Sequence, residues 1–377
     1  VIADFISPDT ICVDSSVKIT NTSTGGTTYN WSFCNGDFKT TPDAVNNGNP
    51  GNTLQLPVYL DYALDDNGNY YAFVTNHSPG KLVRLNYGTS LLNTPIAEDM
   101  GNFGDILPNQ CEGLQIVKTN GKWFVIIVGG GNSGVNSSPR ILKLDFGTSL
   151  TNTPIATNWG NVDNTLNLPH DLFITNIDGK YYGFTINALA NTLVRFDFGT
   201  DFSATPVATD FGNIGNFLNY PDGFAFIQNN GKWYGFIANG LASNIIRIDF
   251  GTSLLNTPVA VNLGNIGGTL SEPRDIAFLS LCSGITGIVS DIDAGSYIVM
   301  LDFGSDITSI PTATNIGNIG NINVPHCLSK FFIENNSIYS FIPNSNNNTI
   351  TRIRFEGCGS PFSTLQNPLP FSYSSPG

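Results

Sequence analysis

Ionisable side chains recur at one position of this sequence, at intervals of roughly 52 to 58 residues. Most of them directly follow a proline, and the set is Glu112, His170, Asp222, Arg274 and His326. One residue further on lie Asp171, Asp275 and Cys327. Carboxylates and imidazoles that converge could bind a sugar or an ion, or perform acid–base chemistry. They can do so only if the surrounding elements bring them together.

Those elements belong to an internal repeat. A short turn motif begins at Asn86, Asp145, Asp197, Asp249 and Asp302, and a degenerate sixth copy follows Arg354. Each repeat has four parts: a segment after a proline, a segment after an Asn-Gly or Asp-Gly turn, an alternating segment ending near the motif, and a TPxA-type segment. Period-two alternation with aromatic and β-branched residues predicts strands. Six units of four strands predict an all-β, six-bladed β-propeller.

The ends of the repeat series suggest how the ring closes. Residues 41–57 match residues 153–169, so a fourth-strand segment precedes the first complete repeat. We expect the strand at 41–47 to complete the blade that begins at Pro325, which removes exposed strand edges. In such a ring the first strand of each repeat faces the axis. The ionisable set is therefore predicted to form an axial funnel for a ligand, or a hydrated channel mouth without one.

The motif itself reads Asp-Phe-Gly in four copies, the triplet with which protein kinases hold magnesium. A kinase also needs a Gly-rich loop, a strand lysine and an H-R-D loop, and none accompanies it here. The copies are predicted to be turns in which Gly supplies the bend and Asp bonds backbone amides. Arg195 with Asp197, and Arg247 with Asp249, are expected to form lateral ion pairs.

Composition restricts the partners. The chain has 377 residues, with 16 Lys plus Arg against 29 Asp plus Glu and a net charge of −13. No basic run is present, which argues against a nucleic-acid partner. No apolar stretch of about 18 residues occurs, so no membrane span is predicted. The chain begins without a signal peptide, and we expect it to be a mature or excised piece of a longer protein.

The six cysteines are too dispersed for a zinc pattern and favour disulfides in an oxidising compartment. Cys34 precedes the closing strand and Cys358 follows the last third strand, so a Cys34–Cys358 bridge would lock the ring. Cys111 and Cys327 both lie at the axial end of a first strand and could also pair. No partner is assigned to Cys12 or Cys282.

The two ends of the chain carry a separate pattern. Tyr29, Trp31, Phe33, Gly36 and Asp37 lie in an ADF…YNWSF…GD arrangement, and a closing segment contains Phe371, Tyr373, Pro376 and Gly377. This arrangement resembles a PKD domain, an immunoglobulin-like β-sandwich; Cys34 departs from it, because a Gly is usual there. The resemblance implies three parts: a PKD-like portion at 1–35, the propeller at 36–358, and a truncated return at 359–377.

PKD-rich proteins with Asn/Thr/Gly-rich propellers resemble surface proteins of Bacteroidota, including adhesins of gliding motility that the type IX system exports. The resemblance implies an extracellular, cell-surface location and neighbouring domains in a longer polypeptide. Thr10, in the sequence Asp9-Thr10-Ile11, fits the O-glycosylation pattern of that phylum.

No cofactor is predicted. The run from Asp65 to Asn69 could offer oxygen ligands to calcium. However, it aligns with the turns between first and second strands and is better explained as a hairpin.

Three functions remain open. The leading hypothesis is a non-enzymatic recognition or adhesion module whose funnel binds a surface glycan or protein. The ligand-binding residues would be Glu112, His170, Asp171, Asp222, Arg274, Asp275 and His326. An alternative is a propeller-type polysaccharide hydrolase or lyase, since paired carboxylates can hydrolyse glycosides. A second alternative is a structural spacer in a surface filament. No G-x-S-x-G or H-E-x-x-H motif occurs, so no catalytic residue is assigned.

Overall fold

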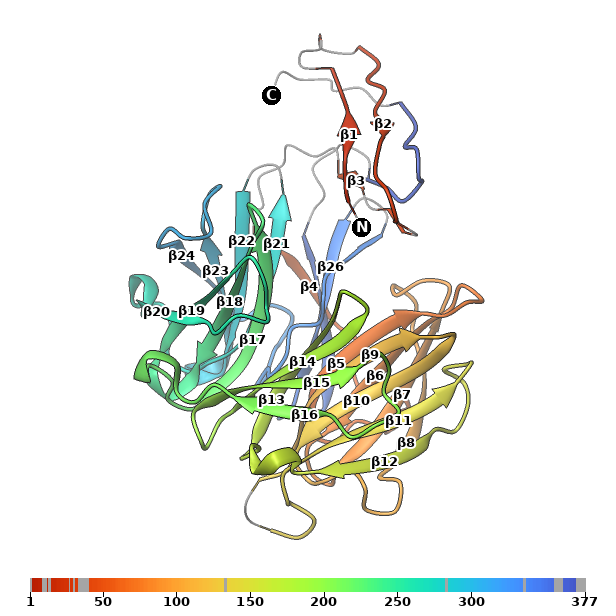
Figure 1. Cartoon of the computed structure of the whole chain (residues 1–377), viewed down its shortest axis with the longest axis vertical. Coiled ribbons are helices and arrows are strands. Elements are labelled where there is room, and N and C mark those ends of the chain that lie inside the picture. Colours follow the sequence, from red (N-terminus) through yellow and green to blue (C-terminus); the bar gives the residue numbers. More distant parts are fainter. Residues whose placement is uncertain are drawn as a thin grey trace.

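The computed structural model describes residues 2–8, 12, 15–26, 28, 29, 31, 32, 41–131, 134–281, 284–334, 337–355 and 362–370. Within this part of the chain, six four-stranded sheets surround a central axis (Figure 1). The predicted six-bladed β-propeller is therefore confirmed. The helices of the described residues are short 3-10 turns, namely η1 (Pro50–Asn52), η2 (Val162–Asn164), η3 (Ile214–Asn216), η4 (Gly240–Ala242), η5 (Ile266–Gly268) and η6 (Asp293–Gly295).

Each blade is an antiparallel sheet, and its strands follow the order of the chain from the axis outward in five of the six blades. Blades 1 to 3 are β5 (Pro57–Leu64), β6 (Tyr70–Asn76), β7 (Lys81–Gly88), β8 (Ile96–Gly101); β9 (Cys111–Thr119), β10 (Lys122–Gly129), β11 (Arg140–Gly147), β12 (Ile155–Gly160); and β13 (Pro169–Ile177), β14 (Lys180–Asn187), β15 (Thr192–Gly199), β16 (Val207–Asp210). Blades 4 to 6 are β17 (Pro221–Asn229), β18 (Lys232–Asn239), β19 (Asn244–Gly251), β20 (Val259–Gly264); β21 (Pro273–Leu281), β22 (Gly284–Asp291), β23 (Tyr297–Asp302), β24 (Thr312–Gly317); and β25 (Phe332–Glu334), β26 (Ser337–Asn344), β27 (Thr349–Phe355), β4 (Asp43–Asn46).

Blade 6 joins the two ends of the propeller. Its outermost strand, β4, comes from the beginning of the chain and pairs with β27 in the register Thr351↔Asn46 to Arg354↔Asp43. Beyond the strand, the Asn47 N–H donates to the Ile350 carbonyl at 2.8 Å. The segment at 41–47 therefore lies in the blade that contains the last repeat, and the ring is closed by strand pairing.

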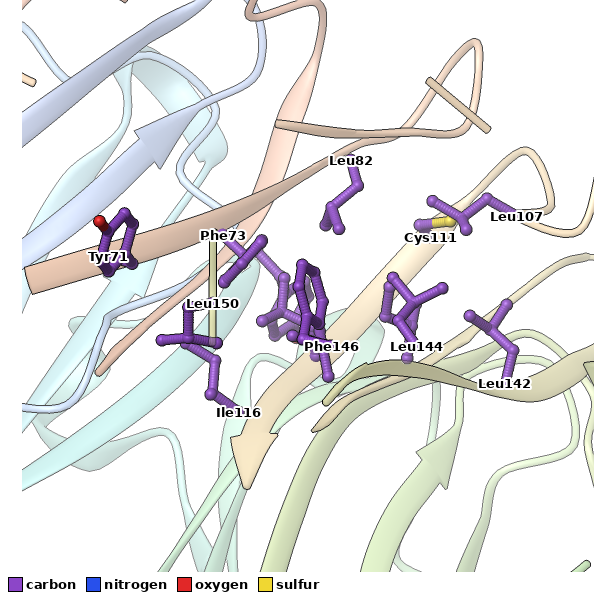
Figure 2. Close-up of a cluster of buried hydrophobic side chains, with 14 of the residues drawn as sticks. Tyr71, Phe73, Leu82, Leu107, Cys111, Ile116, Leu142, Leu144, Phe146 and Leu150 are labelled. Atoms are coloured by element: carbon purple, nitrogen blue, oxygen red, sulfur yellow. The ribbon is translucent and has the colours of Figure 1, made fainter. Parts of the chain in front are cut away.

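The core lies between neighbouring blades. In β7 the side chains alternate between buried and partly exposed positions, with Leu82, Val83 and Leu85 fully buried. Figure 2 shows the cluster between blades 1 and 2, where Phe73 and Phe146 pack with ring centroids 5.0 Å apart. The period-two pattern that predicted strands thus also supplies the apolar faces that hold one blade against the next.

The Asp-Phe-Gly copies are turns between third and fourth strands. The Asp145 carboxylate accepts the N–H of Gly147 at 2.8 Å, and Gly147 has a φ of +64°, a conformation that favours glycine. Arg247 and Asp249 form the expected ion pair at 2.7 Å. Arg195 instead donates to the carbonyl of Leu255 in the next blade at 2.9 Å, so its expected pairing with Asp197 is wrong. The triplet is a repeated turn rather than a metal site.

The terminal segments form two small sheets. β1 (Phe5–Ile6) pairs with β2 (Thr20–Asn21), and β3 (Trp31–Ser32) pairs with β28 (Phe362–Ser363). Figure 1 shows β1, β2 and β3 grouped to one side of the propeller. These short pairings do not make an immunoglobulin-like sandwich within the described residues. The boundaries at 35/36 and 358/359 stay predictions, and Thr10, Cys34, Cys282, Cys358 and the closing segment 371–377 lie outside the described residues.

In four blades the second strand ends at a buried asparagine, namely Asn76, Asn187, Asn239 and Asn344. Asn187 shows how this side chain ties the segment before the first strand to the blade. Its side chain is fully buried, accepts the Asn167 N–H at 2.9 Å and donates to the Thr165 carbonyl at 2.8 Å. We predict that Asn187→Ala lowers the free energy of unfolding by about 2 kcal/mol, because it leaves buried backbone groups without partners. Denaturant unfolding measures the change.

The matched control is Asn158→Ala, which removes an exposed turn side chain that accepts the Gly160 N–H at 2.8 Å. We expect it to cost less than about 1 kcal/mol. Equal losses in the two variants would contradict the role assigned to Asn187.

Candidate functional site

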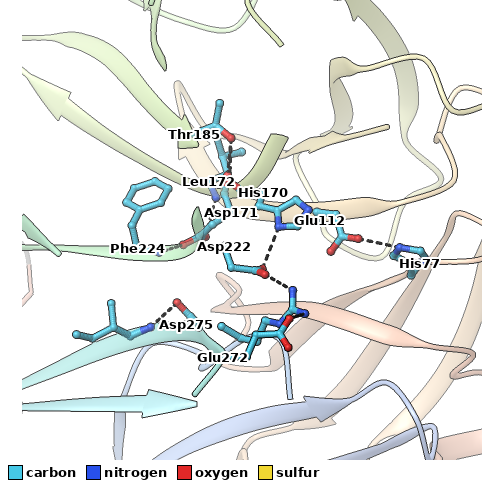
Figure 3. Close-up of polar contacts among 12 residues, drawn as sticks. His77, Glu112, His170, Asp171, Leu172, Thr185, Asp222, Phe224, Glu272 and Asp275 are labelled. Carbon is cyan, nitrogen blue, oxygen red and sulfur yellow. Dashed lines mark hydrogen bonds and ion pairs between the residues drawn. The ribbon is translucent and has the colours of Figure 1, made fainter. Parts of the chain in front are cut away.

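The five recurring ionisable residues meet at the axis. Glu112, His170, Asp222 and Arg274 occupy the second positions of β9, β13, β17 and β21, and His326 lies in the matching segment of blade 6, before β25. Figure 3 shows Glu112 beside His77 and His170 beside Asp222. We call this set, together with His77, the axial layer: His77, Glu112, His170, Asp222, Arg274 and His326. Glu112, His170 and Asp222 are almost completely buried. The repeat therefore brings ionisable groups of different blades into one protected layer.

Hydrogen bonds and ion pairs organise this axial layer. His77 Nε2 lies 2.9 Å from Glu112 Oε1, and His170 Nδ1 lies 2.9 Å from Asp222 Oδ1. The second oxygen of Asp222 pairs with the Arg274 guanidinium, which also contacts Glu272 at 2.5 Å. Charges of opposite sign thus compensate one another across the axis, as buried charges require.

Protonation in the layer follows from these pairs. Burial alone would raise the pKa of Glu112, but His170, His77 and His326 outweigh it and hold the pKa at about 2. Burial opposes ionisation of Asp222 as well, yet Arg274 and His170 lower its pKa. Burial lowers the pKa of His326 to about 4 against the nearby carboxylates, so its imidazole is neutral at pH 7. The layer therefore holds two ionised carboxylates and one neutral histidine.

Next to this layer, along the same first strands, lies a cavity of about 430 Å³. Three carboxyl groups line it, Asp61, Asp171 and Asp275. Its lining includes the aromatic rings of Phe173, Phe226 and Phe278, from β13, β17 and β21, and of Phe331, which directly precedes β25. None of the axial-layer residues lines it. The channel thus contains a polar layer at the start of the first strands and a half-aromatic cavity beyond it.

The cavity carboxyls also join neighbouring blades. Asp171 accepts the N–H of Leu172 at 2.7 Å and the N–H of Phe224, in the next blade, at 2.9 Å. Asp275 accepts the N–H of Ile276 at 2.7 Å and that of Leu328, in the next blade, at 2.6 Å. These bonds fix the orientation of both carboxyls and leave each oxygen with a further lone pair.

Burial raises the pKa of Asp171 to about 6, against the opposing effect of its two backbone hydrogen bonds. Burial and the charge of Asp171 raise the pKa of Asp275 well above its usual value. Both carboxyls therefore hold a proton to higher pH than an exposed aspartate does, and Asp275 is influenced by the charge of Asp171. Buried carboxyls whose pKa values are raised by their surroundings can serve as acid and base near neutral pH.

The backbone around the pair is unusual. Asp171 has a φ of +53°, a region that non-glycine residues rarely adopt. At the same position of blades 2 and 4 the chain has glycine: a Cβ on Gly113 would lie 2.6 Å from the carbonyl carbon of Asp171. On Gly223 it would lie 2.5 Å from an oxygen of Asp275. The glycines make room for the two carboxyls, and the strained Asp171 marks a candidate functional position.

We did not predict two of the cavity residues, Tyr59 and Asp61, or one residue of the axial layer, His77, from the sequence. Tyr59 and Asp61 come from blade 1, where Val58 occupies the position that is ionisable in the other blades. Aligning this first strand residue by residue would have found them. His77 lies after the second strand of blade 1, and only the fold brings it to Glu112.

The two described axial cysteines do not form a disulfide. Cys111 and Cys327 are both free and buried. Cys111 Sγ lies 3.0 Å from the Pro108 carbonyl, whereas Cys327 lies against Leu60 and lines the cavity. The predicted bridge is wrong because Cys111 starts its strand, Cys327 lies deeper in the channel, and blade 1 separates their blades.

The run from Asp65 to Asn69 is a hairpin turn between β5 and β6. Asp65 Oδ1 accepts the N–H groups of Asn67 and Asn69 at 2.9 and 2.8 Å, and Asp66 pairs with Lys118. In the described part of the chain, no three His, Cys, Asp or Glu side chains are grouped so as to hold a metal ion. No helix among these residues is long and apolar enough to cross a membrane.

Solved structures share this fold. The α-L-arabinofuranosidase Arb93A of Fusarium graminearum is 10% identical with a TM-score of 0.55, and the match covers 85% of this chain and 98% of that one. The α-L-arabinofuranosidase PaAbf62A of Podospora anserina is 10% identical with a TM-score of 0.46, covering 66% and 92%. RS223 β-xylosidase is 12% identical with a TM-score of 0.45, covering 73% and 98%. No protein-family model matches the sequence, and a search of curated proteins gives no match.

These findings correct two predictions. The resemblance to PKD-containing adhesins of Bacteroidota is wrong, because no family model matches and the solved structures of similar fold are glycosidases. The expectations of adhesion, gliding motility and type IX secretion lose their basis with it. The prediction that the protein is not an enzyme is also contradicted, because solved structures of the same fold, such as Arb93A, are arabinofuranosidases.

The raised pKa of Asp171 makes a prediction about stability. A carboxyl with a folded-state pKa of about 6 stabilises the fold at pH below its unfolded pKa of about 4, and this contribution is lost as pH rises to about 6. Asp171→Asn does not titrate. We therefore expect its free energy of unfolding, measured relative to wild type, to improve as pH rises from about 4 to about 6.

Denaturant unfolding at several pH values measures this difference. Asp197→Asn, at a turn far from the axis, is the control and should show no comparable trend. A difference between Asp171→Asn and wild type that is independent of pH would contradict the raised pKa.

Proposed function

We propose that this protein is a glycoside hydrolase whose active site is the axial cavity. The observation that carries the proposal is the pair of buried carboxyls Asp171 and Asp275, which line one cavity, are held by backbone N–H groups and have raised pKa values. Glycoside hydrolysis needs one carboxylic acid to protonate the leaving oxygen and one carboxylate to act at the anomeric carbon. The fold shared with arabinofuranosidases supports the same conclusion.

In the proposed reaction, Asp275 donates its proton to the glycosidic oxygen as the bond to the anomeric carbon breaks. The ionised Asp171 acts on the other side of that bond, as nucleophile or as base for the attacking water. Water supplies the hydroxyl of the new reducing end, and its proton restores the acid. The backbone N–H groups that hold both carboxyls reduce the reorganisation needed during the reaction. 

The cavity wall has the chemistry to hold a sugar. Phe173, Phe226 and Phe278 offer an apolar side on which a sugar ring can pack. Opposite them are polar groups, including Tyr59, whose buried hydroxyl has no hydrogen-bond partner. Among the described residues of the lining, the cation Lys330 is paired with Asp61 at 2.9 Å. A sugar ring has one apolar face and a hydroxyl rim and fits this asymmetry.

We further propose that the protein acts outside the cell on a glycan. A polymeric substrate is met there, and the net charge of −13 favours a soluble enzyme that does not adhere to acidic surfaces.

Hydrolysis is tested with arabinofuranosides and arabinan first, and then with other polysaccharides, by release of reducing sugar. We predict that Asp275→Asn and Asp171→Asn each lower kcat by about 10²- to 10⁴-fold, because each removes one proton-transfer or nucleophilic role. Asp197→Asn is the matched control and should retain activity. Folded variants with wild-type rates would rule out these roles, and a wild type inactive on every glycan would overturn the proposed function.

The pH profile gives an independent check. Asp171 must be ionised and Asp275 protonated, so activity should rise as pH increases through about 6 and fall at higher pH as Asp275 ionises. The measurement is kcat/KM from pH 4 to pH 9. A rate that increases toward pH 4 would contradict the assignment.

A further inference from the structure

The axial layer contains polar atoms that lack partners. Among the described residues, six buried side-chain nitrogen or oxygen atoms have no hydrogen-bond partner, and three of them lie in this layer. They are Glu112 Oε2, Arg274 Nε and His326 Nδ1. Unpaired buried polar atoms are rare in folded proteins, and such atoms commonly mark the place of a bound water, ion or ligand.

The other atoms of the same side chains are already engaged. Glu112 Oε1 pairs with His77, and Arg274 pairs with Asp222 and Glu272 through its two terminal nitrogens. These contacts fix the carboxylate and the guanidinium, so the free atoms have defined positions. The Glu112 side chain is only 3% exposed. The layer therefore offers a preorganised acceptor, a donor and an imidazole nitrogen.

This layer is separate from the proposed active site. Four of its members occupy the second position of a first strand, whereas the cavity is lined by later positions of the same strands. At the layer, the His77 and Glu272 side chains are 30% and 33% exposed. Tyr220 lies beside them, with its ring centroid 6.0 Å from the guanidinium carbon of Arg274. Solvent thus reaches the layer at the rim formed by His77, Glu272 and Tyr220.

The charges of the layer define the ligand. Nearby carboxylates raise the pKa values of His77 and His170 against the effect of burial. The positive charges of these histidines and of Arg274 are balanced by the carboxylates of Glu112, Asp222 and Glu272. An anion would meet the free oxygen of Glu112, and a cation would meet Arg274. A neutral group with both donors and acceptors satisfies every free atom. Hydroxyl groups on adjacent carbons have this property.

We propose that the axial layer is a second binding site, for a neutral ligand that presents adjacent hydroxyls, such as one unit of a sugar. One hydroxyl donates to Glu112 Oε2 and its neighbour accepts from Arg274 Nε. His326 bonds to either hydroxyl through its free ring nitrogen. This site does not depend on the proposed hydrolysis, because it uses neither Asp171 nor Asp275.

The chain contains three histidines, and all three belong to this layer. Imidazole NMR signals of histidine-labelled protein therefore report on this site alone. The probes are D-ribose and 2-deoxy-D-ribose, which differ by one hydroxyl. We expect D-ribose to shift the signals saturably, and 2-deoxy-D-ribose to bind at least fivefold more weakly.

Two variants locate the binding. Glu112→Gln removes the charged acceptor and should weaken ribose binding at least tenfold, measured by calorimetry. Arg274→Lys keeps the charge beside Asp222 but removes the Nε donor, so it tests the site even if Glu112→Gln fails to fold. Asp275→Asn should bind ribose like wild type while its hydrolytic activity is lost.

Three results would overturn the proposal. The histidine signals could stay unchanged as ribose is added, which would mean that water alone occupies the layer. Folded Glu112→Gln and Arg274→Lys could both bind ribose as tightly as wild type. Asp275→Asn could lose ribose binding, which would place the sugar in the cavity.

Discussion

The pairing of β4 with β27 holds the ring closed, and the rest of the structure depends on it. Two segments far apart in the sequence form one sheet, and the ion pair between Arg354 and Asp43, which are 311 residues apart, lies along it at 2.5 Å. Without this sheet, blades 1 and 6 would each expose an unpaired edge or face. Closure fixes the six first strands around one axis, and only then do side chains of different blades come within bonding distance.

The ionisable groups at the axis lie at positions where the sequences of the blades differ. A perfect repeat would place six identical residues in each layer, which for six carboxyls would be strongly repulsive. Here the second position carries both acids and bases, so Asp222 is compensated by His170 and Arg274. At the third position glycine precedes each aspartate around the ring, and the space it leaves lets Asp171 and Asp275 bond the next blade. The site is thus a product of asymmetry on a symmetric scaffold.

Periodicity made the propeller and most of the axial residues predictable from the sequence. Glu112, His170 and Asp222 share one position of the repeat, and a closed ring brings equivalent positions together. His77 could not be found in this way, because its contact with Glu112 joins a segment after the second strand of one blade to the first strand of the next. The Cys111–Cys327 prediction was wrong for a related reason, since residues two positions apart in register lie at different depths of the channel.

The PKD resemblance at the termini rested on short motifs, and motifs of this kind fix neither a sandwich nor a function. The raised pKa values of the cavity carboxyls were beyond the sequence, since they depend on burial and, for Asp275, on the charge of Asp171. We propose that these two carboxyls act on a glycan in the axial cavity, and a crystal structure of Asp275→Asn with a bound arabino-oligosaccharide would test this role. We expect a glycosidic oxygen within hydrogen-bond distance of residue 275 and a sugar ring against the Phe226 side of the cavity. An oligosaccharide bound away from the axis would contradict it.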